Sequence, residues 1–211
     1  EILPLPEPFA WLLKKPLAWY IAKTKAEDVK ASMLQAGVGG GGETRSPQLS
    51  TIQSQATALQ ENLIARGIDA TTFLAMRYWH PFASEAVEQM KAEGITKLVI
   101  LPLYPQFSIS TSGSALRVLE RYLYTEPGFP MKSTVVPAWY NRQGFLRASA
   151  RAIAESLRSL PDGEVADAHV LFSAQGLPRK YIDDLSDPYV EQVERSVDLI
   201  AAELEATYGV K

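Results

Sequence analysis

The chain has 211 residues, of which 46% are hydrophobic and 21% are charged, values typical of a globular protein that can bury its own core. It contains no cysteine, which excludes disulfides, thiolate nucleophiles and cysteine metal sites, and only His80 and His169 can supply imidazole. The net charge of -3 gives no reason to expect a nucleic acid partner, and no apolar run reaches the roughly 20 residues of a membrane span.

The first apolar-rich segment is Phe9–Ala22, which two lysines and Pro16 interrupt. These interruptions argue against a membrane-spanning helix. Two interpretations stay open. The segment could contact a membrane surface peripherally, with Trp11, Trp19 and Tyr20 as amphipathic anchors, or it could pack against its own domain.

Short runs of apolar, β-branched or aromatic residues predict strands at Thr71–Ala75, Lys97–Leu103, Lys132–Val136 and Ala168–Ser173. Helix-like segments cover Ser50–Arg66, Ser84–Glu93, Ser114–Tyr124, Arg142–Leu160 and Asp187–Tyr208. Strands that alternate with helices predict an α/β fold, a doubly wound parallel sheet flanked by helices. The second and fourth strands are nearly all apolar, so we expect helices to cover both of their faces. The four consecutive glycines within Val38–Ser46 predict a flexible loop. A phosphate-binding role is disfavoured, because no nucleotide-binding pattern follows a strand there.

The ends of the predicted strands are candidates for a binding site, because doubly wound sheets bind ligands beyond the carboxyl ends of their strands. The segments that follow the four strands are 76–81, 102–114, 137–140 and 174–178. Aromatic residues gather at three of them. They suit a large, flat, apolar ligand, and an arginine suits carboxylates on such a ligand. The alternative that these aromatics are ordinary core or rim residues stays open.

The two histidines do not predict a metal site. His80 precedes a proline, which is more typical of a turn or helix cap than of a metal ligand. His169 opens a predicted strand at the end opposite the expected site.

Several long motifs resemble the ferrochelatase family, whose members insert iron into protoporphyrin. They are LPLYPQFSISTSGSALRVLER (101–121), LFSAQGLP (171–178), MRYWHPF (76–82), VVPAWY (135–140) and DPYVEQVERSVDLIAAEL (187–204). The resemblance is to bacterial and plant-type enzymes and covers nearly the whole chain. It implies two similar α/β lobes with porphyrin between them. We therefore expect residues 1–211 to form a single lobe, with the family's first strand and second lobe absent from this chain.

The resemblance also implies the residues of the site. Porphyrin-binding positions are Met76, Arg77, Tyr78, Tyr104, Ser110, Thr111, Ser112 and Trp139. Gln175 stands where the family pattern SAHG has its catalytic histidine. A neutral imidazole can accept a pyrrole proton near neutral pH and can ligate iron, whereas an amide does neither well. We therefore expect iron insertion to be strongly reduced. We also expect that the protein requires no cofactor and that its ligand is a porphyrin or haem.

Three hypotheses on function therefore stand together: a ferrochelatase-like protein with impaired catalysis, a non-catalytic porphyrin-binding or structural subunit of a larger complex, and an active ferrochelatase seen as a fragment. The absent first strand leaves sheet edges unpaired, so we expect a protein partner or further chain segments to complete the sheet. The family implies the cytoplasm or an organelle matrix (mitochondrion or plastid), often at an inner membrane.

Overall fold

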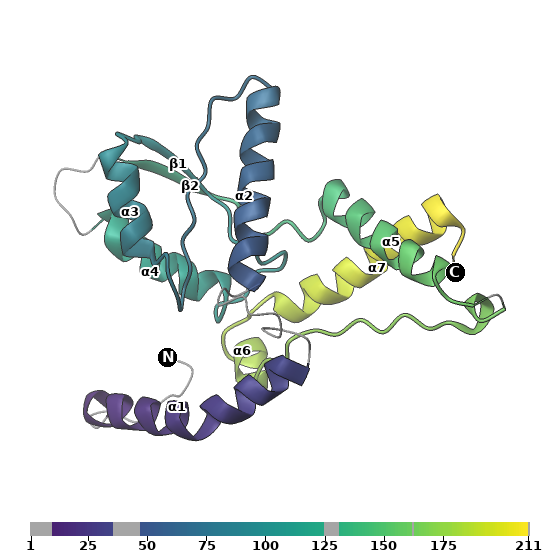
Figure 1. Cartoon of the computed structure of the whole chain (residues 1–211), viewed down its shortest axis with the longest axis horizontal. Coiled ribbons are helices and arrows are strands. Elements are labelled where there is room, and N and C mark those ends of the chain that lie inside the picture. Colours follow the sequence, from purple (N-terminus) through teal and green to yellow (C-terminus); the bar gives the residue numbers. More distant parts are fainter. Residues whose placement is uncertain (1–9, 36–46, 125–130, 162, 211) are drawn as a thin grey trace. The chain divides into compact units, whose positions relative to one another are not determined.

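The computed structural model describes residues 10–35, 47–124, 131–161 and 163–210 (Figure 1). The chain divides into two compact units, Glu1–Ala75 and Met76–Lys211. The prediction of a single family lobe stays a prediction.

The described part of the first unit contains the helices α1 (Ala10–Gln35) and α2 (Pro47–Ala65). The turn after α2 includes Gly67 with a φ of 75°, a left-handed conformation that glycine adopts without steric cost. The predicted strand Thr71–Ala75 is wrong, because these residues form no strand. The Thr72 N–H donates to Gln60 Oε1 of α2 at 2.8 Å, so a helix side chain takes the bond that a neighbouring strand would have supplied.

The second unit begins with a helix, which a strand–helix–strand arrangement follows (Figure 1). Helix α3 (Ala83–Ala92) precedes β1 (Lys97–Ile100), and α4 (Ser112–Tyr124) connects β1 to β2 (Lys132–Val135). The strands pair in parallel, with Lys97 opposite Lys132 and Ile100 opposite Val135. This parallel pair among helices confirms the α/β class and two of the four predicted strands. Its buried residues include Val87, Met90, Leu119 and Leu123 from α3 and α4.

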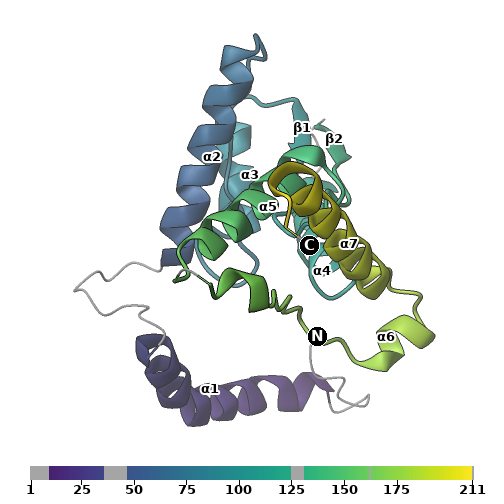
Figure 2. The same ribbon diagram turned by 90° about the vertical axis from the view of Figure 1, so that its right-hand side faces the viewer.

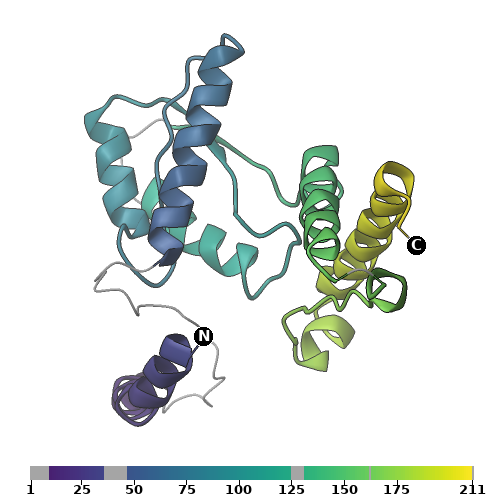
Figure 3. The ribbon, with the colours of Figure 1, turned by 45° about the vertical axis from the view of Figure 1, so that its right-hand side comes forward.

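The remaining regular structure in the described second unit is helical. Helix α5 (Gln143–Arg158) lies beside α7 (Tyr189–Tyr208) in all three views (Figure 1, Figure 2 and Figure 3), and the short helices η1 (Val165–Asp167) and α6 (Arg179–Asp183) lie between them in sequence. Ala150, Ala154 and Leu204 form a buried cluster in this helix pair. Small alanine side chains let two helices approach closely, which buries the leucine between them.

The fourth predicted strand, Ala168–Ser173, is wrong, because this segment is neither strand nor helix. A strand needs a neighbour for its N–H and C=O groups, and among the described residues only β1 and β2 pair as strands. The expectation of apolar strands covered on both faces is also wrong for this structure. Leu171 is 92% exposed, and Val99 of β1 is 66% exposed.

Some of the observed helices were not predicted from the sequence. The predicted helices begin at Ser50, whereas α1 already covers Ala10–Gln35. The short helices η1 and α6 were not predicted. The glycine-rich stretch 38–46 lies outside the described residues.

Candidate functional site

The serine-rich loop between β1 and α4 is tightly folded. The Ser108 carbonyl accepts hydrogen bonds from the N–H groups of Thr111 at 3.2 Å and Gly113 at 2.9 Å. A side chain at Gly113 would lie 3.4 Å from the Ser108 carbonyl oxygen and 3.6 Å from the Phe107 ring. Ser108 and Ser112 are both fully buried. The loop is therefore a closely packed turn, in which a Cβ at position 113 would make ordinary van der Waals contacts.

Side chains near the start of α7 hold this loop. Oδ2 of the buried Asp187 accepts hydrogen bonds from Ser108 Oγ at 2.9 Å and from the Ile109 N–H at 2.8 Å. Oε1 of Gln192 accepts one from the Phe107 N–H at 2.8 Å. Sequence reasoning missed both residues. The signal that could have found Asp187 is an aspartate just before a helix, a position that favours side-chain bonds to the backbone.

Gln175 lies in an exposed segment that contacts the same helix. Its backbone N–H donates to the Tyr189 hydroxyl at 3.1 Å, and the residue itself is exposed. The first turn of α7 therefore contacts both the serine-rich loop and the Gln175 segment. These two predicted parts of the site are thus joined through a helix end that the sequence-based site did not include.

Arg77 joins the turn after residue 75 to the start of α4. Its Nε donates to Ser114 Oγ at 3.2 Å, and its guanidinium carbon lies 4.7 Å from the centre of the Tyr78 ring. The Met76 N–H donates to the Pro81 carbonyl at 2.7 Å, which closes the turn. Tyr78 and Trp79 are 62% and 64% exposed, so their rings face solvent.

His80 lies in the turn before α3, as predicted, where it contacts a capping carboxylate. Its Nδ1 lies 2.8 Å from Glu85 Oε2, and the same oxygen accepts the Phe82 N–H at 2.6 Å at the start of α3. The Phe82 hydrogen bond, with a smaller contribution from His80, lowers the pKa of Glu85. His169 lies in the segment that forms no strand and is exposed.

Trp139 connects the segment after β2 to the segment after β1. Its Nε1 donates to the Pro102 carbonyl at 2.8 Å, and its backbone N–H donates to the Pro105 carbonyl at 2.8 Å. Its ring meets the Phe145 ring edge-on, with 5.3 Å between the centres. Tyr104, between the two prolines, is 41% exposed. The segments that follow the two observed strands are therefore held together, as their common position beyond the strands predicts.

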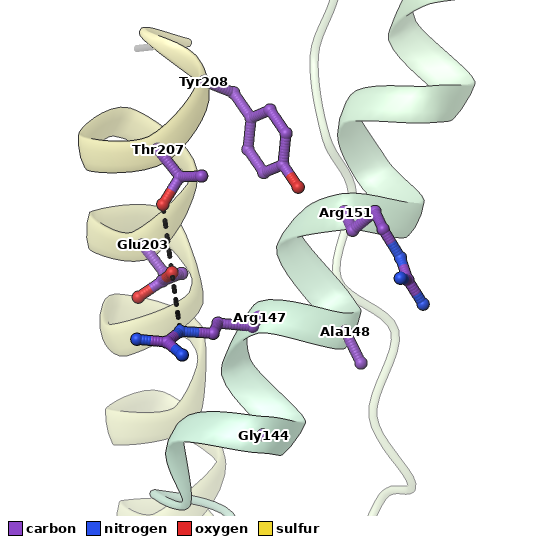
Figure 4. A pocket seen from close by; sticks show the side chains of 7 residues that line it. All are labelled: Gly144, Arg147, Ala148, Arg151, Glu203, Thr207 and Tyr208. Atoms are coloured by element: carbon purple, nitrogen blue, oxygen red, sulfur yellow. Dashed lines mark hydrogen bonds and ion pairs between the residues drawn. The ribbon is translucent and has the colours of Figure 1, made fainter.

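A hollow in the described second unit lies elsewhere. It is a groove of about 520 Å³ between α5 and α7, lined by Gly144, Arg147, Ala148, Arg151, Glu203, Thr207 and Tyr208 (Figure 4). None of the predicted porphyrin-binding residues lines it. Within the described ranges, no group of three or more His, Cys, Asp or Glu side chains could hold a metal ion.

Two further observations concern the predicted membrane contact. Of the helices in the described part of the chain, none is long and apolar enough to cross a bilayer. Apolar side chains are spread around α1 instead of forming one apolar face, although Trp19 and Tyr20 are exposed. Peripheral contact through Phe9–Ala22 stays a prediction, as does the compartment.

The contacts above define an α/β protein in which one helix end anchors a serine-rich loop after the first strand and a second loop that carries Gln175. The family model described as Ferrochelatase matches residues 2–210, and the chain belongs to the ferrochelatase family. The chain is 44% identical to the ferrochelatase of Synechocystis sp. over 206 residues, 97% of this chain and 50% of that protein. It is 47% identical to the ferrochelatase of Synechococcus elongatus over 195 residues, 92% of this chain and 48% of that protein.

A plant relative is similarly close. The chain is 45% identical over 207 residues to "Ferrochelatase-2, chloroplastic" of Oryza sativa subsp. indica, 97% of this chain and 38% of that protein. The chain spans about half the length of the cyanobacterial relatives that it matches, and less of the rice protein. The matches confirm the family to which the long motifs pointed, including its cyanobacterial and plant branches.

Proposed function

We propose that this chain is a porphyrin-binding member of the ferrochelatase family in which Gln175 leaves iron insertion strongly reduced. The observation that carries the proposal is the amide residue itself. Gln175 occupies the position to which the resemblance assigns a histidine, in a loop fastened to α7 by the bond from its N–H to Tyr189.

The chemistry of metal insertion explains the expected loss of activity. Two pyrrole N–H protons must leave the porphyrin, and a metal ion must reach the ring nitrogens. An imidazole with a pKa near neutral can accept such a proton, and a positioned general base typically contributes about 10²–10⁴-fold to a rate. The glutamine amide is not basic at neutral pH. We therefore expect binding without efficient insertion.

Several side chains support a porphyrin as the ligand. Tyr78, Trp79 and Tyr104 expose a large part of their rings. Exposed aromatic rings can stack on a flat macrocycle. The Arg77 guanidinium beside Tyr78 supplies a positive charge that suits the propionate carboxylates of protoporphyrin.

Titration of the chain with protoporphyrin IX, followed by porphyrin fluorescence, tests the proposal. We expect saturable binding that Trp79→Ala and Tyr104→Ala weaken. Leu59→Ala, a truncation on α2, is the control and should bind as the unaltered chain does. Absence of saturable binding by the folded, unaltered chain would refute the proposal.

Exposed apolar residues favour a second candidate function, that of a structural subunit. Leu171 and Val99 come from two predicted strands and are 92% and 66% exposed. Large exposed apolar surfaces often mark interaction sites. We propose that a further polypeptide segment, from a protein partner or from the remainder of the native polypeptide, covers them. Amide exchange at residues 168–173 should then be slow in the native protein and fast in the 211-residue chain, and fast exchange in both would contradict this.

A further inference from the structure

Asp187 is the only buried ionisable residue among those that the structure describes, with 4% exposure. Both of its carboxylate oxygens accept hydrogen bonds. Oδ2 accepts from Ser108 Oγ at 2.9 Å and from the Ile109 N–H at 2.8 Å, while Oδ1 accepts from the Tyr189 N–H at 3.0 Å. The Asp187 N–H donates to the Tyr181 carbonyl at 2.9 Å. A buried carboxylate is tolerated when donors surround it in this way.

The donors to Asp187 come from two distant parts of the chain. Ser108 and Ile109 lie 79 and 78 residues before it, in the serine-rich loop. Tyr189 lies two residues after it, so Oδ1 closes a local turn at the start of α7. The Tyr189 hydroxyl then accepts the Gln175 N–H at 3.1 Å. One carboxylate thus connects the serine-rich loop to the residue that holds Gln175.

We propose that Asp187 is a positioning residue that fixes the spacing between the serine-rich loop and the Gln175 loop. This inference rests on the proposed function, because these loops carry predicted porphyrin-binding positions and the degenerate histidine position. Asp187 itself is buried and acts only through the residues that it holds.

An amide cannot replace the carboxylate at this position. In the Asp187→Asn variant, one orientation of the new side chain turns its amide oxygen toward Ser108 and Ile109 and its NH₂ group toward the Tyr189 N–H. In the other orientation, the NH₂ group faces the Ile109 N–H. Either orientation opposes two donors and leaves a backbone N–H without its acceptor, although the side-chain volume hardly changes. Asp187→Asn therefore separates the hydrogen-bonding role from simple packing.

The same carboxylate also orients the hydroxyl groups of the loop. Ser108 Oγ has one hydrogen, which it donates to Asp187. In its 2.9 Å contact with Ser110 Oγ, Ser108 must then be the acceptor and Ser110 the donor. The Ser110 hydroxyl hydrogen is directed inward, so this predicted porphyrin-binding residue presents oxygen lone pairs to a ligand. A carboxylate on the ligand would have to find its donors elsewhere, as at Arg77.

The experiment compares Asp187→Asn with Asp198→Asn, which makes the same change at an exposed position of α7. Three quantities are measured on the full chain: amide exchange at Ile109 and Gln175, the thermal midpoint of unfolding, and the Kd for protoporphyrin IX. For Asp187→Asn we expect about 10-fold or more faster exchange at Ile109 and about 10-fold weaker binding, the size expected for a hydrogen bond to a charged group. Asp198→Asn should change neither.

Tyr189→Phe is a second variant that keeps the ring and the carboxylate. It removes only the hydroxyl that accepts the Gln175 N–H, so exchange should accelerate at Gln175 and remain unchanged at Ile109. If Asp187→Asn does not fold, amide exchange in Tyr189→Phe still tests the inference. Unchanged exchange at Gln175 in Tyr189→Phe would overturn the inference.

The outcomes separate this inference from the proposed function. If the unaltered chain binds no protoporphyrin, the proposed function fails and this inference fails with it. If the unaltered chain binds and Asp187→Asn matches Asp198→Asn in exchange and affinity, only the positioning role is overturned. The positioning role is also overturned if Asp187→Asn accelerates exchange uniformly and lowers affinity only in proportion to the unfolded fraction.

Discussion

Replacement of Arg77 by methionine tests how the chain would recognise porphyrin carboxylates. Methionine keeps an unbranched apolar side chain but removes the charge and the bond from Nε to Ser114. A hydrogen bond to a charged group contributes roughly 1.5–3 kcal/mol. Arg77 is half-buried, so solvent screens part of its interaction, and we expect a loss of about 1–2 kcal/mol, which is about 5–30-fold in Kd.

The assay is a fluorescence titration with protoporphyrin IX and with its dimethyl ester, which has the same ring but no carboxylates. The unaltered chain should prefer the free acid, and Arg77→Met should lose that preference while binding the ester as before. Arg179→Met, on the exposed surface of α6, is the control with the same chemical change. Equal weakening for acid and ester would refute the carboxylate role, and so would no weakening at all.

Three further predictions follow from the contacts. Leu204→Ala should lower the free energy of unfolding by about 2–5 kcal/mol, because it leaves a cavity beside Ala150 and Ala154. Urea denaturation measures this loss, and it should show a smaller loss for the control Leu59→Ala, since Leu59 is 42% exposed. Trp139→Phe should cost about 0.5–1.5 kcal/mol in the same assay, since the Pro102 carbonyl loses its indole donor, and an unchanged midpoint would contradict this. The pKa of Glu85 is lowered in the folded protein, so its ionised form stabilises the fold above its ordinary pKa, and this contribution is lost as the pH falls through the lowered value. The difference in unfolding free energy between the unaltered chain and Glu85→Gln should therefore shrink on acidification. A difference that does not depend on pH would contradict this prediction.

Local sequence signals predicted the paired strands and five helices, namely α2, α3, α4, α5 and α7. Gly67, Gly94 and Gly209 follow predicted helices and adopt positive φ values of 75°, 69° and 69°. A helix end at glycine depends on the conformational freedom of that single residue, so it can be predicted from the sequence alone. Lys97–Leu103 and Lys132–Val136 were predicted as strands and contain β1 and β2.

Pairing between distant segments could not be read from the sequence. Ala168–Ser173 has a strand's composition, but a strand requires a neighbour, and the described residues pair only β1 with β2. The same limit applied to the site. Ser110 and Gln175 were assigned to the site from motifs, whereas the connection through Asp187 and Tyr189 depends on contacts between residues up to 79 positions apart.

The most direct test of the account measures anaerobic Fe2+ insertion into protoporphyrin IX by the native polypeptide and by its Gln175→His variant. Because the Gln175 N–H bond to Tyr189 involves the backbone, the substitution should preserve the fold. The account predicts insertion close to the uncatalysed background for the native polypeptide, and a rate about 100-fold or more higher for the histidine variant, the contribution of a positioned general base. Insertion by the native polypeptide at an enzyme-like rate, unchanged by Gln175→His, would contradict it.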